Sequence, residues 1–236
     1  MRAFTADDVL TAAERLRAEP PPRRAAAILA LATGMPRGEA MALPIGERDD
    51  RLLALRIATF GREMIGVIDC PACGEPCETI VDAAALRIDD DGGRETVEVT
   101  HGDWRVRARL PNTDDVAEAA AVKDAVVARR LLLERCIVER SGDGELPDEL
   151  VDALEEEMER ADPRGDIRLA LVCPQCARPW SAAFDVAGFF WIEVNAAAKR
   201  LVQEVDILAR TYGWSERDIL GMPVARRRTY IEKCLE

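Results

Sequence analysis

Two cysteine pairs of the same form lie far apart in the chain: Cys70-Pro-Ala-Cys73, followed by Gly74, and Cys173-Pro-Gln-Cys176. Each pair is typical of a knuckle, a tight turn that directs two thiolates at one point. Two knuckles together supply the four sulfurs of a closed tetrahedral zinc site. Such a site would join two distant segments, so the spacing predicts one discontinuous domain with an insertion between its halves.

The predicted metal site is structural. We expect one Zn²⁺ held by four thiolates, from Cys70, Cys73, Cys173 and Cys176. With four protein ligands the ion has no open position for water, so it stabilises a fold rather than catalysing a reaction. A fifth cysteine, Cys77, could compete as a ligand, but its strand-like surroundings predict a residue of the strand. Cys136 and Cys234 lie in helical patterns and are expected to be buried apolar positions.

Composition and charge exclude several classes of protein. Of 236 residues, 48% are hydrophobic and 32% are charged, as in an ordinary globular protein. The longest apolar run, residues 25–32, is too short for a membrane span, and the N-terminus lacks the apolar stretch of a signal peptide. We therefore expect a cytoplasmic protein whose cysteines are thiols or metal ligands. A net charge of −12 disfavours general nucleic-acid binding.

Hydrophobic periodicity predicts an α+β fold that is mostly helical and carries a small zinc-ribbon β module. We divide the chain into an N-terminal helical region, a discontinuous zinc-ribbon module, a helical insertion and a C-terminal helical module. These are residues 1–62, residues 63–111 plus 166–185, residues 112–165, and residues 186–236.

Two parts of the centre are predicted in more detail. Alternating residues predict a hairpin over 96–110, turning at 101–103, and acidic and glycine residues predict a turn at 89–93. The arginines of the second hairpin strand would form either a solvated sheet face or a partner-facing surface. In the insertion we expect one long alanine-rich helix from about residue 112 to 140, and then a short acidic helix over 148–161.

No catalytic arrangement can be assembled from the sequence. The one histidine, His101, falls in the predicted hairpin turn, and no phosphate-binding loop of the Gly-x-x-x-x-Gly-Lys-Ser/Thr form is present. The His-x-Glu element of zinc deaminases is also missing. The acidic run 155–159 is typical of a solvated helix face. We therefore predict that the chain is not an enzyme, and a hydrolase with an unrecognised site is the weakest alternative.

The C-terminal region predicts three consecutive helices. The first ends at Gly213, Ser215 caps the second, and Pro223 opens the third. Two interpretations compete: a helix-turn-helix that binds DNA, or a packing module whose aromatic residues fix the turns. The acidity of the whole chain favours the second interpretation.

An ordered set of motifs runs along most of the chain. The motifs are Leu-Pro-Ile-Gly-Glu-Arg-Asp at 43–49, Cys-Pro-Ala-Cys-Gly-Glu at 70–75, Cys-Pro-Gln-Cys with a following Trp and Phe-Asp at 173–185, Leu-Ala-Arg-x-Tyr-Gly-Trp-Ser-Glu-x-Asp-Ile-Leu at 208–220, and Arg-Arg-Arg-x-Tyr at 226–230. In this order they resemble the T4-type phage baseplate protein family, in particular its zinc-bearing members. The resemblance implies a non-enzymatic role in a contractile tail, of a phage or of a phage-tail-like injection system.

The resemblance also implies partners. They would be other baseplate, hub, spike or tube proteins, and the chain would be either a resident baseplate subunit or an assembly factor. We expect the partner surface on the C-terminal helices, at Trp214, Arg226, Arg227, Arg228 and Tyr230. The alternatives are packing within the chain for the two aromatic residues and ordinary solvation for the arginines. The rival function is a zinc-ribbon, helix-turn-helix regulator that binds DNA.

Overall fold

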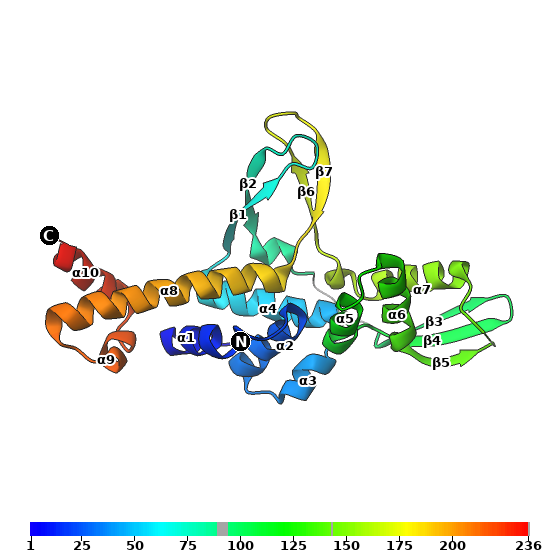
Figure 1. The fold of residues 1–236 in the computed structure, drawn as a ribbon, viewed down its shortest axis with the longest axis horizontal. Helices are drawn as coiled ribbons and strands as arrows, with labels where there is room; N and C mark the ends of the chain where they lie inside the picture. The colour runs from blue at the N-terminus through cyan, green and yellow to red at the C-terminus, as the bar shows by residue number, and fades with distance from the viewer. Residues whose placement is uncertain (89–93, 143, 236) are drawn as a thin grey trace.

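A body of helices carries three projections in the computed structural model, which describes residues 1–88, 94–142 and 144–235. Figure 1 shows a β ribbon above the body, a mixed α/β unit on one side and a helical arm on the other. The turn expected at residues 89–93 lies outside the described residues. The α+β fold with small sheets is confirmed.

The N-terminal region forms four helices. They are α1 (Ala6–Arg15), α2 (Pro21–Thr33), α3 (Arg37–Ala42) and α4 (Ile45–Phe60). The hydroxyl of Thr5 accepts a hydrogen bond from the backbone N–H of Asp8, whose carboxylate accepts one from the N–H of Thr5, so a capping box begins α1. Gly34, at φ 74°, ends α2. The short α3 was not predicted.

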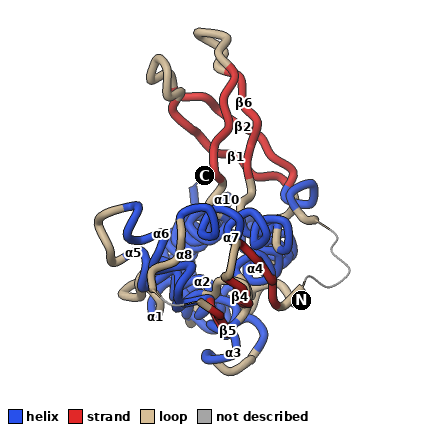
Figure 2. The backbone as a smooth tube through the Cα atoms, turned by 90° about the vertical axis from the view of Figure 1, so that its right-hand side faces the viewer, coloured by secondary structure: helices blue, strands red, loops and turns tan. Residues whose placement is uncertain are grey.

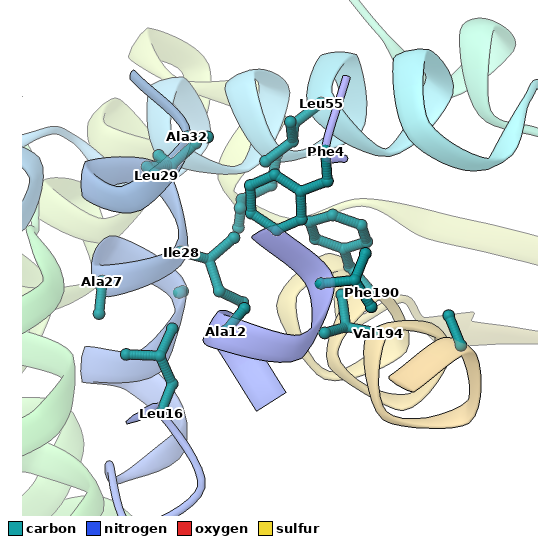
Figure 3. Close-up of a cluster of buried hydrophobic side chains, with 14 of the residues drawn as sticks. Phe4, Ala12, Leu16, Ala27, Ile28, Leu29, Ala32, Leu55, Phe190 and Val194 are labelled. Atoms are coloured by element: carbon teal, nitrogen blue, oxygen red, sulfur yellow. The ribbon is translucent and has the colours of Figure 1, made fainter. Parts of the chain in front are cut away.

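The core of the body forms where α8 (Val186–Tyr212) crosses the N-terminal helices. Phe190 on α8 packs against Phe4, with ring centroids 6.2 Å apart, and Ile28 and Leu55 close the cluster from α2 and α4. Figure 3 shows these side chains meeting between the helices. The first half of α8 and the N-terminal region therefore share one hydrophobic core.

The ribbon consists of two antiparallel hairpins, each a separate two-stranded sheet. The strands are β1 (Glu63–Asp69) with β2 (Pro76–Asp82), and β6 (Arg168–Val172) with β7 (Pro179–Ala183). Figures 1 and 2 show the two hairpins rising side by side from the body, and each hairpin turns at one knuckle. A short 3₁₀ helix, Ala83–Leu86, leads out of the first hairpin, and another, Pro163–Gly165, leads towards the second.

The side unit holds the other sheet and its own core. Strands β3 (Thr96–His101), β4 (Trp104–Arg109) and β5 (Ile137–Ser141) pair in that order, and α7 (Asp148–Ala161) packs on them. The core includes Val97 and Val106 of the sheet, and Leu150 and Leu154 of α7. The hairpin over 96–110 forms as predicted, but it pairs with β5 and not with the ribbon strands, although the predicted zinc-ribbon module of residues 63–111 includes it.

The prediction of one long helix over residues 112–140 is wrong. Two helices, α5 (Thr113–Ala120) and α6 (Ala125–Cys136), occupy this stretch, and β5 follows them. The carboxylate of Asp124 accepts hydrogen bonds from the backbone N–H groups of Val126 and Val127, at 2.9 and 3.0 Å, and so begins a new helix. The β-branched Ile137 and Val138 then favour a strand. The acidic helix expected at 148–161 is confirmed as α7.

The C-terminal arm follows the predicted pattern. Gly213, at φ 69°, ends α8, and the hydroxyl of Ser215 accepts from the N–H of Asp218 at the start of α9 (Glu216–Leu220). The last helix, α10 (Val224–Leu235), begins after Pro223 and packs against α8. Within the described parts of the chain, no helix is both long enough and apolar enough to cross a membrane.

Candidate metal centre

The first knuckle is a tight backbone loop at the tip of the β1–β2 hairpin. The N–H of Cys70 donates to the carbonyl of Glu75 at 2.9 Å, and the N–H of Gly74 donates to the carbonyl of Cys70 at 2.8 Å. Gly74 has φ 75°, in the left-handed region that glycine adopts without steric cost. This conformation closes the loop and brings both cysteines of the pair to one end of the hairpin.

The second knuckle repeats this geometry at the tip of the β6–β7 hairpin. The N–H of Cys173 donates to the carbonyl of Arg178 at 3.1 Å, and the N–H of Ala177 donates to the carbonyl of Cys173 at 2.9 Å. Ala177 stands where the first knuckle has its glycine and has φ 56°, which makes it the only described non-glycine residue with positive φ. The two knuckles therefore differ in backbone strain, and the strain is in the second.

The two knuckles bring the four predicted cysteines together. All four Sγ atoms lie within 4.8 Å of one another, with Cys70 to Cys176 at 3.8 Å and Cys73 to Cys173 at 3.6 Å. Four sulfurs at about 2.3 Å from a tetrahedral Zn²⁺ would be about 3.8 Å apart. The size of the cluster thus fits the ion. Among the described residues it is the one such group of Cys, His, Asp and Glu side chains.

The surroundings of the cluster favour a thiolate at Cys173. Cys70 and Cys173 are buried, whereas Cys73 and Cys176 are exposed. The backbone N–H of Cys176 donates to the Sγ of Cys173 at 3.5 Å and, together with further amide and thiol contacts, lowers the pKa of the Cys173 thiol to about 6. A buried thiolate is costly unless a cation compensates it. The cluster is therefore suited to a divalent metal.

The fifth nearby cysteine lies under the site. Cys77 is buried in β2 beside Cys70, Cys173 and the ring of Trp180. Its Sγ donates to the carbonyl of Glu75 at 3.3 Å, and burial together with the neighbouring thiols raises the pKa of Cys77 to about 11. Cys77 is thus placed as a protonated packing residue of the strand. Elsewhere in the chain Cys136 is buried as expected, but Cys234 is only half-buried.

The candidate aromatic residues of the C-terminal arm pack against one another. Tyr212 stacks on Trp214 with ring centroids 4.5 Å apart, and Tyr230 meets Trp214 edge to face at 4.9 Å. Trp214 and Tyr230 are half-buried by these contacts. The two aromatic candidates, Trp214 and Tyr230, thus follow the alternative interpretation, packing within the chain. Their contacts join α10 to the end of α8.

The three consecutive arginines have different environments. Arg227 is 3% exposed, and its guanidinium donates to the Glu204 carboxylate at 2.7 Å and to the Met222 carbonyl at 3.0 Å. Arg226 and Arg228 are exposed. Of the five candidate partner-binding residues, only these two present a full side chain to solvent.

Two buried polar contacts that we did not predict position the ribbon and the insertion. The Arg56 guanidinium donates to the Glu193 carboxylate at 2.9 and 2.6 Å and to the carbonyls of Gly61 and Glu63, each at 2.6 Å. It thereby joins α4, α8 and the base of β1. These contacts connect residues 137 positions apart, and no local motif marks them.

A second contact joins the end of the insertion to α4. The Asp162 carboxylate accepts from the N–H of Gly46 at 2.8 Å, at the start of that helix. A Cβ at Gly46 would lie 2.0 Å from the Asp162 carboxylate, so only glycine fits there. A carboxylate at a helix N-terminus is also favoured by the helix dipole.

Comparison with known proteins gives one match. A family model described as "T4 bacteriophage base plate protein" matches residues 1–191, which include the whole ribbon and all four clustered cysteines. No curated protein and no solved structure matches the chain. The arm beyond residue 191 lies outside the matched range.

Proposed function

Because the chain belongs to the T4 bacteriophage base plate protein family, we propose that it serves a contractile tail baseplate as a non-enzymatic protein that acts through protein–protein contacts. The family match over residues 1–191 is the observation that carries this proposal. The tail belongs to a phage or to a phage-tail-like injection system. The partners are other baseplate, hub, spike or tube proteins, which the protein meets in the cytoplasm and joins in the tail particle.

The four clustered cysteines hold one structural Zn²⁺ in this proposal. The size of the cluster and its two buried thiols support the assignment. The ion would join the tips of two hairpins that are each only two strands wide, a size that is marginally stable alone. Its role is then to keep the ribbon rigid and projecting from the body.

The domain division needs two changes. Residues 96–110 belong with the insertion, since β3 and β4 pair with β5 and share a core with α7. The ribbon is then residues 63–82 with 168–183. The first half of α8 belongs with the N-terminal body, whose core it completes.

The partner surface that we assign to the C-terminal arm consists of Arg226 and Arg228. Both are exposed on α10, and the aromatic cluster of Trp214 and Tyr230 holds that helix against α8. Arg227 serves the fold instead, through its buried pair with Glu204. The arm would therefore offer two positive charges on a rigid support to an acidic surface.

A tagged full-length chain recovered from the native host, split into particle-sedimenting and soluble fractions, tests the role. We expect sheath, tube or spike proteins with it: in particles for a resident subunit, and only in the soluble fraction for an assembly factor. Recovery of none of them would contradict the proposal. Salt-sensitive binding to duplex DNA would then favour the DNA-binding regulator.

The arm surface is tested in the same recovery experiment. Reversing both exposed charges, Arg226→Glu with Arg228→Glu, should reduce recovery of the partner at least tenfold. The matched control reverses two exposed arginines of the helical body, Arg15→Glu with Arg17→Glu, and should leave recovery unchanged. Equal recovery with both double variants would remove the arm from the partner surface.

A further inference from the structure

The hairpin of β1 and β2 leaves apolar side chains in solvent on its outer face. Ile65, Val67 and Ile80 are 55%, 64% and 65% exposed, although Met64 and Cys77 on the opposite face are buried. Ile65 and Ile80 are direct cross-strand partners, and Val67 lies two residues along on the same face. The three β-branched side chains therefore form one continuous apolar patch on a projecting element.

Carboxylates surround this patch. Glu63 and Asp69 lie on the same face of β1, and Glu78 is the cross-strand partner of Val67 on β2. These three form no ion pair with any described residue, whereas Asp82, at the base of the hairpin, is paired with Arg62. No lysine or arginine lies on the outer face of either strand. An exposed apolar patch with a polar rim is typical of a protein–protein interaction site.

We propose that this outer ribbon face, Ile65, Val67 and Ile80 with Glu63, Asp69 and Glu78, binds a different protein whose surface combines apolar side chains with lysine or arginine. Burial of the three branched side chains supplies the affinity. The three unpaired carboxylates select a basic rim and speed association with it. This surface lies on the ribbon, away from the helical arm, so the inference does not depend on the arm being a docking site.

The charge pattern selects among possible occupants. A second copy of the chain would bring the same three carboxylates against these, and like charges in contact oppose association. Anionic lipid surfaces and nucleic acid are repelled for the same reason. A basic protein surface is the occupant that satisfies both the apolar centre and the acidic rim.

Photo-crosslinking in the native host identifies the occupant. The full-length chain carries p-benzoylphenylalanine in place of Val67, and a control carries it in place of Ser181, on the outer face of the other hairpin. We expect position 67 alone to cross-link to a different protein, through a peptide that contains apolar residues and lysine or arginine. Cross-links to a second copy, cross-links of equal yield from position 181, or no cross-link would overturn the proposal.

The partner protein that the cross-link identifies is then purified, and its affinity for the chain is measured to complete the test. Ile65→Ser with Ile80→Ser, and separately Glu78→Lys, should each weaken binding at least tenfold, and binding to the wild-type chain should weaken as salt rises. Ser181→Lys and the double reversal Arg226→Glu with Arg228→Glu should bind as wild type does. Wild-type affinity in the face variants, with zinc content and circular dichroism unchanged, would overturn the proposal even if the chain is a baseplate protein.

Discussion

At the scale of single residues, the knuckles differ at one position. Gly74 and Ala177 both adopt left-handed backbone, but a side chain there costs an L-residue about 1–2 kcal/mol. Gly74→Ala should therefore weaken zinc affinity by about 1 kcal/mol, roughly fivefold, because the ligands become ordered when the ion binds. Ala177→Gly should leave affinity unchanged or raise it up to about fifteenfold, since the ~1–2 kcal/mol of relieved strain is partly offset by about 0.4–1 kcal/mol of unfolded-chain entropy. Competition with a chromophoric chelator measures both.

Gly102 provides the control for this pair. It also has positive φ, at 57°, but it lies in the β3–β4 turn, away from the cysteines. Gly102→Ala should lower the stability of the insertion by a similar amount and leave zinc affinity unchanged. If Ala177→Gly weakened zinc affinity as Gly74→Ala does, the account of strain in the second knuckle would be contradicted.

At the scale of elements, one buried arginine fixes α10. Arg227→Met keeps most of the apolar stem but leaves the Glu204 carboxylate and the Met222 carbonyl without their donor. Leaving such acceptors unsatisfied costs about 1–3 kcal/mol. Amide hydrogen exchange along α10 should accelerate roughly 5- to 150-fold, because this helix opens locally once the contact is lost.

The neighbouring arginine is the matched comparison. Arg228 is exposed in the same helix, and Arg228→Ala should change exchange along α10 little, as surface substitutions do. Similar acceleration in the two variants would mean that the ion pair with Glu204 does not hold α10 against α8. The aromatic contacts of Trp214 and Tyr230 would then be the main attachment.

Elements whose signals are local could be predicted, and elements that depend on distant partners could not. Thr5, Gly34, Gly213 and Ser215 act through hydrogen bonds or backbone angles within a few residues, and each marks a helix end in the structure. The cysteine pairs are local motifs too. In contrast, β5 is a strand because β4, about 30 residues earlier, supplies its hydrogen bonds. The helical pattern of residues 125–136 runs directly into β5, so no local signal marks where the helix ends and the strand begins.

The candidate site shows the same division. The meeting of the four cysteines could be predicted because each knuckle is a recognisable local motif. The burial of Arg227 could not be predicted, since it depends on α10 folding back onto Glu204 of α8, and a triplet of arginines suggests only exposure. The outer ribbon face was also missed, because Ile65, Val67 and Ile80 look like core residues of a strand until the pairing shows which face is covered.

At the scale of the whole molecule, removal of zinc should act on one projection and spare the rest. The helical body and the insertion each have their own hydrophobic core, whereas the tips of the ribbon hairpins meet at the cysteines and Trp180. A chelator, or Cys173→Ser, should therefore raise hydrogen exchange in β1, β2, β6 and β7 and leave α1, α2, α4 and α8 protected. Wild-type protein should carry one zinc per chain, and Cys77→Ser should retain it.

Loss of the ion should also affect the two proposed docking surfaces differently. The outer ribbon face is displayed by a hairpin that is two strands wide, so its apolar patch is ordered only while the ribbon is rigid. The arm is fixed by the Arg227–Glu204 pair and by aromatic packing, neither of which involves the metal. Metal-free protein should therefore lose affinity for a ribbon partner at least tenfold and keep its affinity for an arm partner. Equal loss at both surfaces would show that the metal stabilises the molecule as a single unit.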